Sequence, residues 1–166
     1  MFQLILRIWA DGELPCEWNF GIICPILKTA DPMAFSKYRG ILLLNIAYKI
    51  LSYILYDRLS KYTERIIGKY QCGFRKGKST TNQIFTSSQI MEKTVEYQTG
   101  VHHLLIDFKS AYDSIYREKL LCAMMEFGIP SKLIRVVKAT MTNVQCSVQV
   151  QSHLSEPIST TWSEAR

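Results

Sequence analysis

The alternation of apolar and polar positions along this chain predicts both strands and helices. Residues 144–150 alternate strictly between apolar and polar side chains, which predicts a half-buried antiparallel strand. The hairpin partner of this strand is expected at 158–162. Two aromatic and β-branched stretches, 18–27 and 38–44, are separated by turn residues and predict an antiparallel strand pair. Residues 104–106 form a short apolar run, which predicts a strand covered on both faces.

Apolar residues at helical spacing predict the remaining elements. The predicted helices cover residues 2–10, 46–62, 79–98, 110–125 and 131–141. Asn45, Ser79 and Ser131 stand where a side chain can cap the helix that follows. The first helix is expected to be the end of a longer element, so Met1 is expected to be an internal residue of a longer protein. Strands interspersed with helices predict an α+β fold in which an antiparallel sheet packs against helices.

Composition narrows the class of protein. The chain has 166 residues, 48% of them hydrophobic, which is enough for one domain with a core. Its net charge of +6 and its pI of about 9.1 favour a nucleic-acid partner. Five cysteines without a Cys-x-x-Cys pair indicate reduced thiols in an intracellular protein, nuclear or cytoplasmic, and offer no zinc-site spacing. The apolar stretch 41–56 is interrupted by Lys49, so no membrane span is expected.

Asp107 is the first candidate for chemistry, because it directly follows the predicted strand 104–106. An ionised carboxylate is costly to bury unless it is paired or bound to a metal ion, so the mouth of a cleft would suit it. A cap on the following helix is the alternative interpretation. Asp113, in the first turn of that helix, has the alternative of a simple ion pair with Lys109 or Arg117. Spacing alone leaves both structural alternatives open.

Residues 73–78 form a basic stretch whose glycines would let the backbone approach a phosphate closely, although such stretches are usually only solvated loops. The run Ile-Asp-Phe-Lys-Ser-Ala-Tyr-Asp-Ser-Ile at 106–115 resembles the first catalytic motif of reverse transcriptases of non-LTR (LINE-type) retrotransposons. Residues 71–80, Gln-Cys-Gly-Phe-Arg-Lys-Gly-Lys-Ser-Thr, are similar to the second conserved block of these enzymes. Segments 37–44 and 25–32 are similar to the two blocks that precede it.

The resemblance covers residues 18–162 and implies a fragment of an RNA-directed DNA polymerase from a retrotransposon, which transfers nucleotides by two-metal catalysis. It divides the chain into fingers with connecting helices, over 1–100, and an N-terminal palm, over 101–166. The implied partners are an RNA template, a DNA primer, deoxynucleoside triphosphates, and the C-terminal palm and thumb of a longer protein. Mg²⁺ or Mn²⁺ is the implied cofactor, expected only in the complete domain.

Three positions of the first motif acquire roles through the resemblance. Asp107 matches the aspartate that binds the catalytic metal ions, and the backbone carbonyl of Phe108 is expected beside the second ion. Tyr112 matches the aromatic residue that packs under the incoming sugar and rejects a 2′-hydroxyl, with an ordinary core aromatic as the alternative. Asp113 matches a recurrent residue that is not itself the main metal ligand, so it ranks below Asp107.

The basic residues acquire roles in the same way, because the fingers of this family contact the incoming triphosphate and the template. Arg39 and Arg75 are the candidates for nucleotide binding, since a guanidinium makes fork-shaped contacts to phosphate. Lys28, Lys76 and Lys78 are lower-ranked candidates for contacts to the nucleic-acid backbone.

The sequence departs from the family pattern in its carboxylates. No two acidic residues are adjacent, so the family's aromatic-Ala-Asp-Asp turn is absent, as is its Gln-Gly-rich block. Asp107 alone would hold magnesium weakly, so the 166-residue fragment is expected not to polymerise DNA. The alternative interpretation is a truncated, catalytically inactive remnant that keeps its affinity for nucleic acid. An aspartate-nucleophile phosphatase is disfavoured, because Lys109 occupies the position of its second aspartate.

Overall fold

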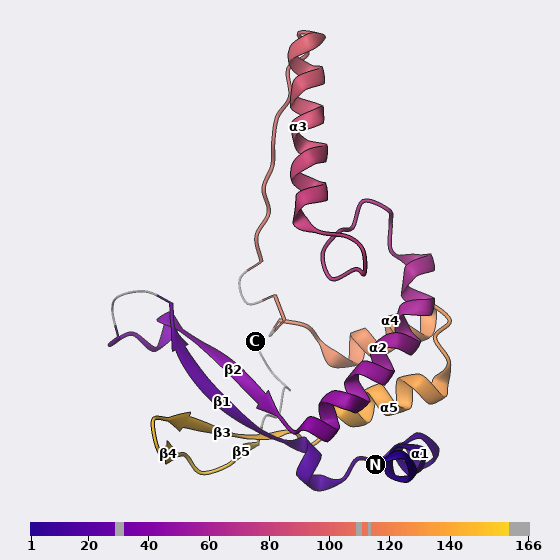
Figure 1. The fold of residues 1–166 in the computed structure, drawn as a ribbon, viewed down its shortest axis with the longest axis vertical. Helices are drawn as coiled ribbons and strands as arrows, with labels where there is room; N and C mark the ends of the chain where they lie inside the picture. The colour runs from indigo at the N-terminus through magenta and orange to yellow at the C-terminus, as the bar shows by residue number, and fades with distance from the viewer. Residues whose placement is uncertain (29–31, 109–110, 113, 160–166) are drawn as a thin grey trace. The chain divides into compact units, whose positions relative to one another are not determined.

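The computed structural model describes residues 1–28, 32–108, 111–112 and 114–159 (Figure 1). These residues belong to two compact units. The first unit joins Met1–Tyr62 to Ser114–Arg166, and the second unit is Thr63–Asp113. This division follows contacts within the chain, whereas the predicted division into fingers and palm at about residue 100 is functional and stays a prediction.

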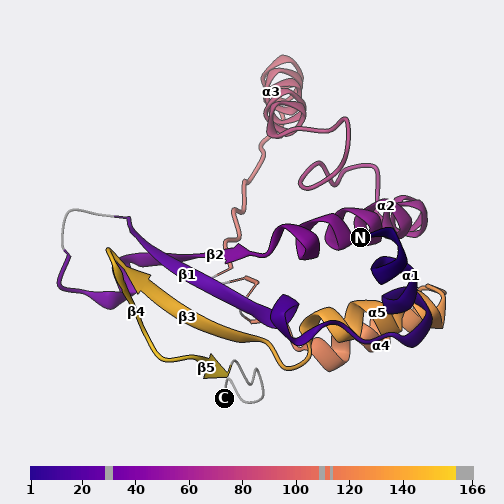
Figure 2. The same ribbon diagram turned by 60° about the horizontal axis from the view of Figure 1, so that its bottom comes forward.

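Helices supply the core of the first unit. They are α1 (Phe2–Asp11), α2 (Ile46–Ile66, most of which belongs to this unit), α4 (Arg117–Glu126) and α5 (Ser131–Met141). Leu51 of α2 and Val136 of α5 are fully buried, and Ile8 of α1 is almost so. Trp18, in the 3₁₀ helix η1 (Cys16–Asn19), joins the same cluster. Figure 2 shows these helices gathered at the end of the sheet where β1 begins.

The sheet of the first unit has the strand order β2-β1-β3-β4, and β5 also pairs with β3. Its strands are β1 (Phe20–Leu27), β2 (Tyr38–Leu44), β3 (Gln145–Val150), β4 (His153–Leu154) and β5 (Ile158–Ser159). A short 3₁₀ helix, η2 (Phe35–Lys37), precedes β2. The predicted pairing of β1 with β2 is confirmed, and so is the pairing of β3 with residues 158–159 of its predicted partner; both pairs are antiparallel. Residues 160–162 of that predicted partner lie outside the described residues.

The α+β class is confirmed, but the sheet is mixed where an antiparallel sheet was predicted. β1 and β3 run parallel, with Gly21 opposite Cys146 and Ile23 opposite Val148. The chain between these strands passes through several helices, and such a crossover lets two strands enter a sheet in the same direction. A strand's alternation pattern reports its half-buried face and carries no information about the direction of its neighbour.

The second unit contains the end of α2, the helix α3 (Thr80–Glu96) and, on either side of α3, described segments without regular secondary structure. Ser79 and Asn82 form a reciprocal capping box at the start of α3, which confirms the predicted cap. Gly100 follows the helix, as expected. Among the described residues of α3 none is buried, so this helix exposes apolar side chains such as Phe85 and Val95.

The predicted strand at 104–106 is wrong. Leu104, Leu105 and Ile106 are 85%, 93% and 71% exposed and belong to no helix or strand. A short apolar run becomes a strand only when a partner supplies its backbone hydrogen bonds, and the described part of the second unit contains no strand. The helix predicted from Ser110 begins instead at Arg117, and Ser110 itself lies outside the described residues.

Two further sequence signals can be compared with the structure. The Asn45 side chain accepts a hydrogen bond from the backbone N–H of Ala47 at 2.8 Å, so the predicted cap of α2 is confirmed. Ser131 is the first residue of α5 and Pro130 holds the cap position, so the predicted Ser131 cap is wrong.

All five cysteines are free thiols. None of the helices in the described ranges is both long and apolar enough to cross a membrane.

Candidate functional site

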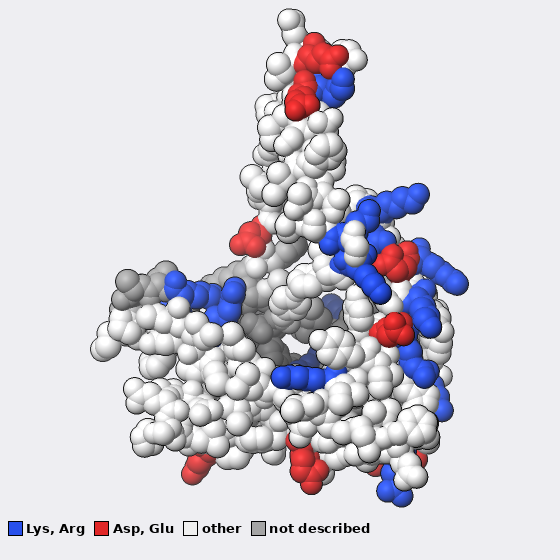
Figure 3. Space-filling model, in the orientation of Figure 1, with Lys and Arg blue, Asp and Glu red and all other residues white. Residues whose placement is uncertain are grey.

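The loop that joins α2 to α3 contains the basic stretch 73–78. Figure 3 shows Lys and Arg side chains gathered over this loop, with acidic side chains among them. Lys76 and Lys78 are exposed, whereas the side chain of Arg75 is only 11% exposed. Phe74 and Gly77 have backbone φ angles of 58° and 74°, so the chain turns sharply on both sides of Lys76. The three cations of this stretch are therefore in different environments.

Arg75 faces inward because it is bound to a carboxylate at the end of α2. Its Nε atom donates to Glu64 Oε1 at 3.2 Å, and its Nη2 atom pairs with Glu64 Oε2. Its Nη1 atom donates to the carbonyl oxygens of Gly68 at 2.9 Å and Gln71 at 3.3 Å. The hydrogen bonds from Arg75 hold the pKa of the Glu64 carboxyl below its ordinary value, and the Lys78 charge adds to this effect.

Phe74 and Tyr112 bring the basic loop into contact with the segment that follows Asp107. Their ring centroids are 6.1 Å apart at an interplanar angle of 83°, an edge-to-face arrangement. Both residues belong to the second unit. The predicted nucleotide-binding aromatic residue, Tyr112, is thus exposed and next to the predicted phosphate-binding loop, and it is not a core aromatic.

Asp107 lies in the exposed segment 101–108 without regular secondary structure. Phe108 beside it is also exposed. Asp113, the lower-ranked acid of the same motif, lies outside the described residues. Within the described ranges no three His, Cys, Asp or Glu side chains are grouped so that they could hold a metal ion. The metal role predicted for Asp107 and Phe108 stays a prediction.

The other predicted phosphate-binding residues belong to the β1–β2 hairpin of the first unit. Arg39 is exposed on β2 and is opposite Ile26 of β1. Lys28 follows β1, and its backbone N–H donates to the carbonyl oxygen of Lys37 at 2.9 Å. The hairpin therefore brings Lys28 and Arg39 to the same end of the strand pair, as two solvent-facing cations that a phosphate backbone could contact.

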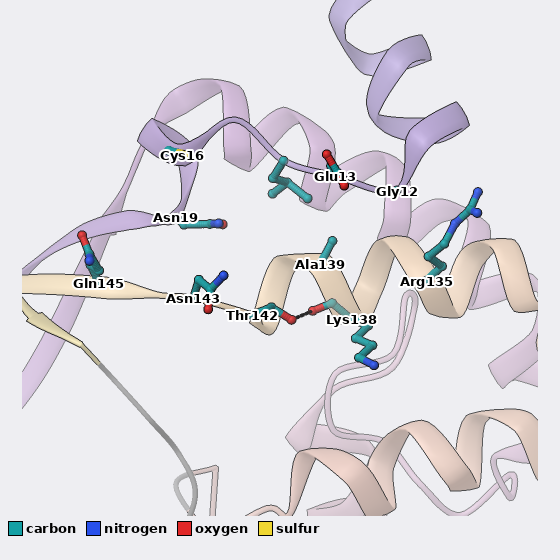
Figure 4. Close-up of a pocket in the computed structure, with 11 residues that line it drawn as sticks. Gly12, Glu13, Cys16, Asn19, Arg135, Lys138, Ala139, Thr142, Asn143 and Gln145 are labelled. Carbon is teal, nitrogen blue, oxygen red and sulfur yellow. Dashed lines mark hydrogen bonds between the residues drawn. The ribbon is translucent and has the colours of Figure 1, made fainter.

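A pocket of about 520 Å³ occurs elsewhere in the first unit, between the end of α1, η1 and the end of α5 (Figure 4). Arg135 and Lys138 line it together with Glu13 and with the side-chain amides of Asn19 and Gln145. The Nη2 atom of Arg135 donates to the carbonyl oxygen of Ala10 at 2.9 Å, so this hydrogen-bond donor is already used within the protein. The lining combines acidic, basic and amide side chains, so it does not favour one class of ligand. It includes none of the residues predicted for catalysis or nucleotide binding.

Glu64 is the residue of this site that the sequence did not reveal. It lies in the last turn of α2, where an acid is usually only part of a solvated helix surface. No spacing rule links it to Arg75, because the intervening chain is an irregular loop. The signal that could have found it is the conspicuous position of one acid just before a stretch rich in cations.

Comparison with known proteins accounts for the order of these motifs. A family model described as "Reverse transcriptase (RNA-dependent DNA polymerase)" matches residues 26–161. The Drosophila melanogaster protein named "Probable RNA-directed DNA polymerase from transposon BS" is 26% identical over 160 residues, which cover 95% of this chain and 17% of that protein. The D. melanogaster "RNA-directed DNA polymerase from mobile element jockey" is 26% identical over 158 residues, covering 93% of this chain and 17% of the relative.

A third D. melanogaster protein, "Putative 115 kDa protein in type-1 retrotransposable element R1DM", is 28% identical over 131 residues, covering 77% of this chain and 12% of that protein. The chain thus spans 12% to 17% of the length of these curated relatives. The family match includes both the basic loop and the Asp107 segment. The resemblance identified from the sequence motifs is confirmed, and the chain belongs to the reverse transcriptase family.

Proposed function

We propose that this chain is part of an RNA-directed DNA polymerase of a retrotransposon, which adds deoxynucleotides to a DNA primer on an RNA template. The observation that carries the proposal is the family match over residues 26–161, which spans the hairpin cations, the basic loop and the Asp107 segment in the family's order. The proposal assigns residues 1–100 to the fingers and residues 101–166 to the first part of the palm.

The proposed catalytic segment is 107–113. Asp107 is the proposed metal ligand, the backbone carbonyl of Phe108 is proposed to face the second ion, and Asp113 is a weaker candidate. Tyr112 is proposed to lie under the sugar of the incoming nucleotide. Its exposure and its contact with Phe74 support this role, because a residue that selects a sugar must be reachable by the nucleotide and held in place.

The described residues do not by themselves fit a two-metal site. Polymerases of this family use divalent ions, and two such ions need several oxygen ligands to replace water. Asp107 is a single exposed carboxylate, and the described chain offers no group of three metal-binding side chains. Mg²⁺ or Mn²⁺ binding is therefore proposed only for a longer protein in which the C-terminal palm contributes further carboxylates.

Binding of the template and primer is proposed for two cationic surfaces, one on each unit. The hairpin surface comprises Lys28 and Arg39, and the loop surface comprises Lys76 and Lys78. Lys and Arg side chains bind a phosphate backbone by releasing its counterions, so affinity falls as salt rises. The net charge of +6 supports this proposal, because a positively charged chain attracts the negatively charged phosphates. Arg39 is also proposed to contact the incoming triphosphate. The same role for Arg75 stays a prediction, because it would require the Arg75 guanidinium to leave Glu64.

A catalytically inactive remnant that only binds nucleic acid is the second candidate. The lack of a metal-binding group among the described residues favours it for the 166-residue chain taken alone. The two candidates share the binding surfaces and differ in whether the complete protein extends a primer.

Primer extension with labelled deoxynucleotides on an RNA template tests the proposal. We expect the 166-residue chain alone to give no extension in Mg²⁺, and a longer product of the same element to extend the primer. In that product Asp107→Asn should abolish extension, whereas Asp57→Asn, an exposed acid of α2, should leave it unchanged. Equal activity of the Asp107→Asn protein and the unmodified protein would overturn the catalytic assignment, and inactivity of the unmodified longer product would favour the remnant.

A further inference from the structure

The cations of the basic loop are in two environments, one turned inward and the other exposed to solvent. Arg75 is turned inward, and four hydrogen bonds of its guanidinium are accounted for by the Glu64 carboxylate and by two backbone carbonyls. A guanidinium has five N–H groups in a fixed fork, so little of its donor capacity remains for a ligand. Lys76 and Lys78, on either side of Gly77, are exposed.

The contacts of Arg75 join three parts of the second unit. Glu64 belongs to the last turn of α2, while Gly68 and Gln71 form the turn at the start of the loop. The carbonyl oxygen of Arg75 accepts a hydrogen bond from the backbone N–H of Lys78 at 3.2 Å, which closes the turn that carries both lysines. Arg75 therefore links the end of a helix to the turn whose tip presents Lys76 and Lys78.

The backbone of this turn needs such support. Phe74 adopts a left-handed conformation, which is unfavourable for a residue with a Cβ atom and persists only when neighbouring contacts hold it. The Gln83 side chain of α3 donates to the carbonyl oxygen of Tyr70, which ties the start of the loop to the next helix. The Arg75 contacts tie the residue directly after Phe74 to the carbonyl oxygens of Gly68 and Gln71 at the start of the loop.

We propose that Glu64 and Arg75 are positioning residues that hold the basic loop in shape, and that Lys76 and Lys78 are the residues that contact phosphate. This inference rests on the proposed function, because it assumes that the loop binds phosphate groups of nucleic acid or of a nucleotide. It changes the role expected for Arg75 from a ligand of the nucleotide to an anchor of the loop. Glu64 acquires a role through Arg75 and does not touch the substrate.

The lowered pKa of Glu64 is consistent with this arrangement, because both Arg75 and Lys78 stabilise the ionised carboxylate. The competing idea is that Glu64 only occupies the place of a phosphate, which would displace it from Arg75 on binding. The two ideas differ in what removal of the Glu64 charge does. If Glu64 only blocks a phosphate site, removal of its charge should tighten phosphate binding. If Glu64 anchors the loop, removal of its charge should loosen the loop without tightening binding.

Binding of a fluorescein-labelled RNA–DNA hybrid to the whole chain, followed by anisotropy over a series of salt concentrations, tests the proposal. We expect Lys76→Ala and Lys78→Ala each to lower the salt slope by about 0.7 to 0.9. With equal affinities at 1 M salt, this corresponds to about five- to eightfold weaker binding at 0.1 M salt. Lys132→Ala, an exposed lysine of α5, removes the same charge and should leave the slope unchanged. Arg75→Ala should leave the slope unchanged and speed amide hydrogen exchange in residues 68–78 several-fold.

Glu64→Gln and Arg75→Lys provide the conservative variants. Both should speed exchange in the same residues without tightening binding, because each breaks the fork-shaped pair but keeps the Lys76 and Lys78 charges. Glu92→Gln, an exposed acid of α3, controls for the loss of one negative charge. Tighter binding and a steeper salt slope for Glu64→Gln than for Glu92→Gln would overturn the proposal, as would an Arg75→Ala slope that falls as far as that of Lys78→Ala.

The outcomes separate this inference from the proposed function. Salt-independent binding, or no binding, by the unmodified chain would remove both. If binding depends on salt but Arg75→Ala lowers the slope as Lys78→Ala does, or Glu64→Gln tightens binding, only the anchoring role would be removed. Competition with dATP identifies the source of the phosphate: displacement of the hybrid by dATP that weakens in Lys78→Ala indicates a triphosphate site, and its absence indicates the nucleic-acid backbone.

Discussion

The ring of Phe74 meets the ring of Tyr112 edge to face, with 6.1 Å between their centroids. Phe74 belongs to the basic loop and Tyr112 to the segment that follows Asp107, so this contact joins two motifs that are distant in sequence. An edge-to-face pair limits how far the loop can move relative to Tyr112. The loop and the proposed sugar-contacting residue are therefore structurally coupled.

This coupling is measurable. In a double-mutant cycle of Phe74→Ala and Tyr112→Ala, we expect a coupling of about 0.5 kcal/mol in the free energy of unfolding, the low end for aromatic pairs. The low value is expected because the two residues are 89% and 70% exposed. Urea unfolding of the four proteins gives the coupling. The same cycle with Tyr97, a similarly exposed tyrosine directly after α3 in the same unit, in place of Tyr112 should show none.

The Glu64–Arg75 pair predicts a pH dependence of the second unit. The pKa of Glu64 is lowered in the folded chain from its ordinary value of 4.5, chiefly by its hydrogen bonds with Arg75. A lowered carboxyl pKa means that the contribution to stability is present above the unfolded pKa and is lost as pH falls through the folded pKa. Amide exchange in residues 68–78, corrected for intrinsic rates, should be protected at pH 6 and accelerate below about 4.5. The Glu64→Gln protein should be less protected at pH 6 and show little further change.

The left-handed backbone at the end of α1 requires glycine at position 12. Its φ of 76° is left-handed, and an added Cβ atom would lie 2.7 Å from Nε of Arg135. Gly12→Ala should therefore lower the free energy of unfolding by about 1 to 2 kcal/mol. Gly100→Ala is the matched control, because nothing lies within 4 Å of its Cβ position. A Gly12→Ala protein as stable as Gly100→Ala would contradict the left-handed end of α1.

The stability of the first unit should be especially sensitive to loss of the Leu51 side chain. It is fully buried among helices α1, α2, α4 and α5, so Leu51→Ala leaves a cavity. The expected loss is about 2 to 5 kcal/mol in the free energy of unfolding, measured with urea and far-UV circular dichroism. Tyr53→Ala, two residues along the same helix but 75% exposed, should change stability by less than about 0.5 kcal/mol. Similar losses at the two positions would argue against the observed core.

Local signals predicted the parts of the fold that depend on neighbouring residues. Asn45 and Ser79 cap the helices that follow them, as their side chains allow, and β1 pairs with β2 across a turn. Ser131 has the same chemistry but is not a cap, because Pro130 already holds the cap position. These features are decided within a few residues, so the amino-acid order is enough to predict most of them.

The wrong strand prediction at Leu104–Ile106 and the unpredicted pairing of Arg75 with Glu64 have a common physical reason. A strand needs hydrogen-bonding partners from elsewhere in the chain, and an apolar run cannot specify whether they are present. A cation needs a carboxylate at the correct distance, and no spacing along an irregular loop specifies Glu64 as the partner of Arg75. In both cases the deciding group is distant along the chain or separated by an irregular backbone.

The sequence by itself determined the family, the α+β class and the set of candidate residues, because motif order and periodicity are properties of the chain alone. Only the tertiary structure decided that β1 and β3 run parallel, that Tyr112 meets Phe74, and that Arg75 is bound inward. These features depend on the direction and distance between groups that folding brings together, and the linear order of residues contains neither quantity.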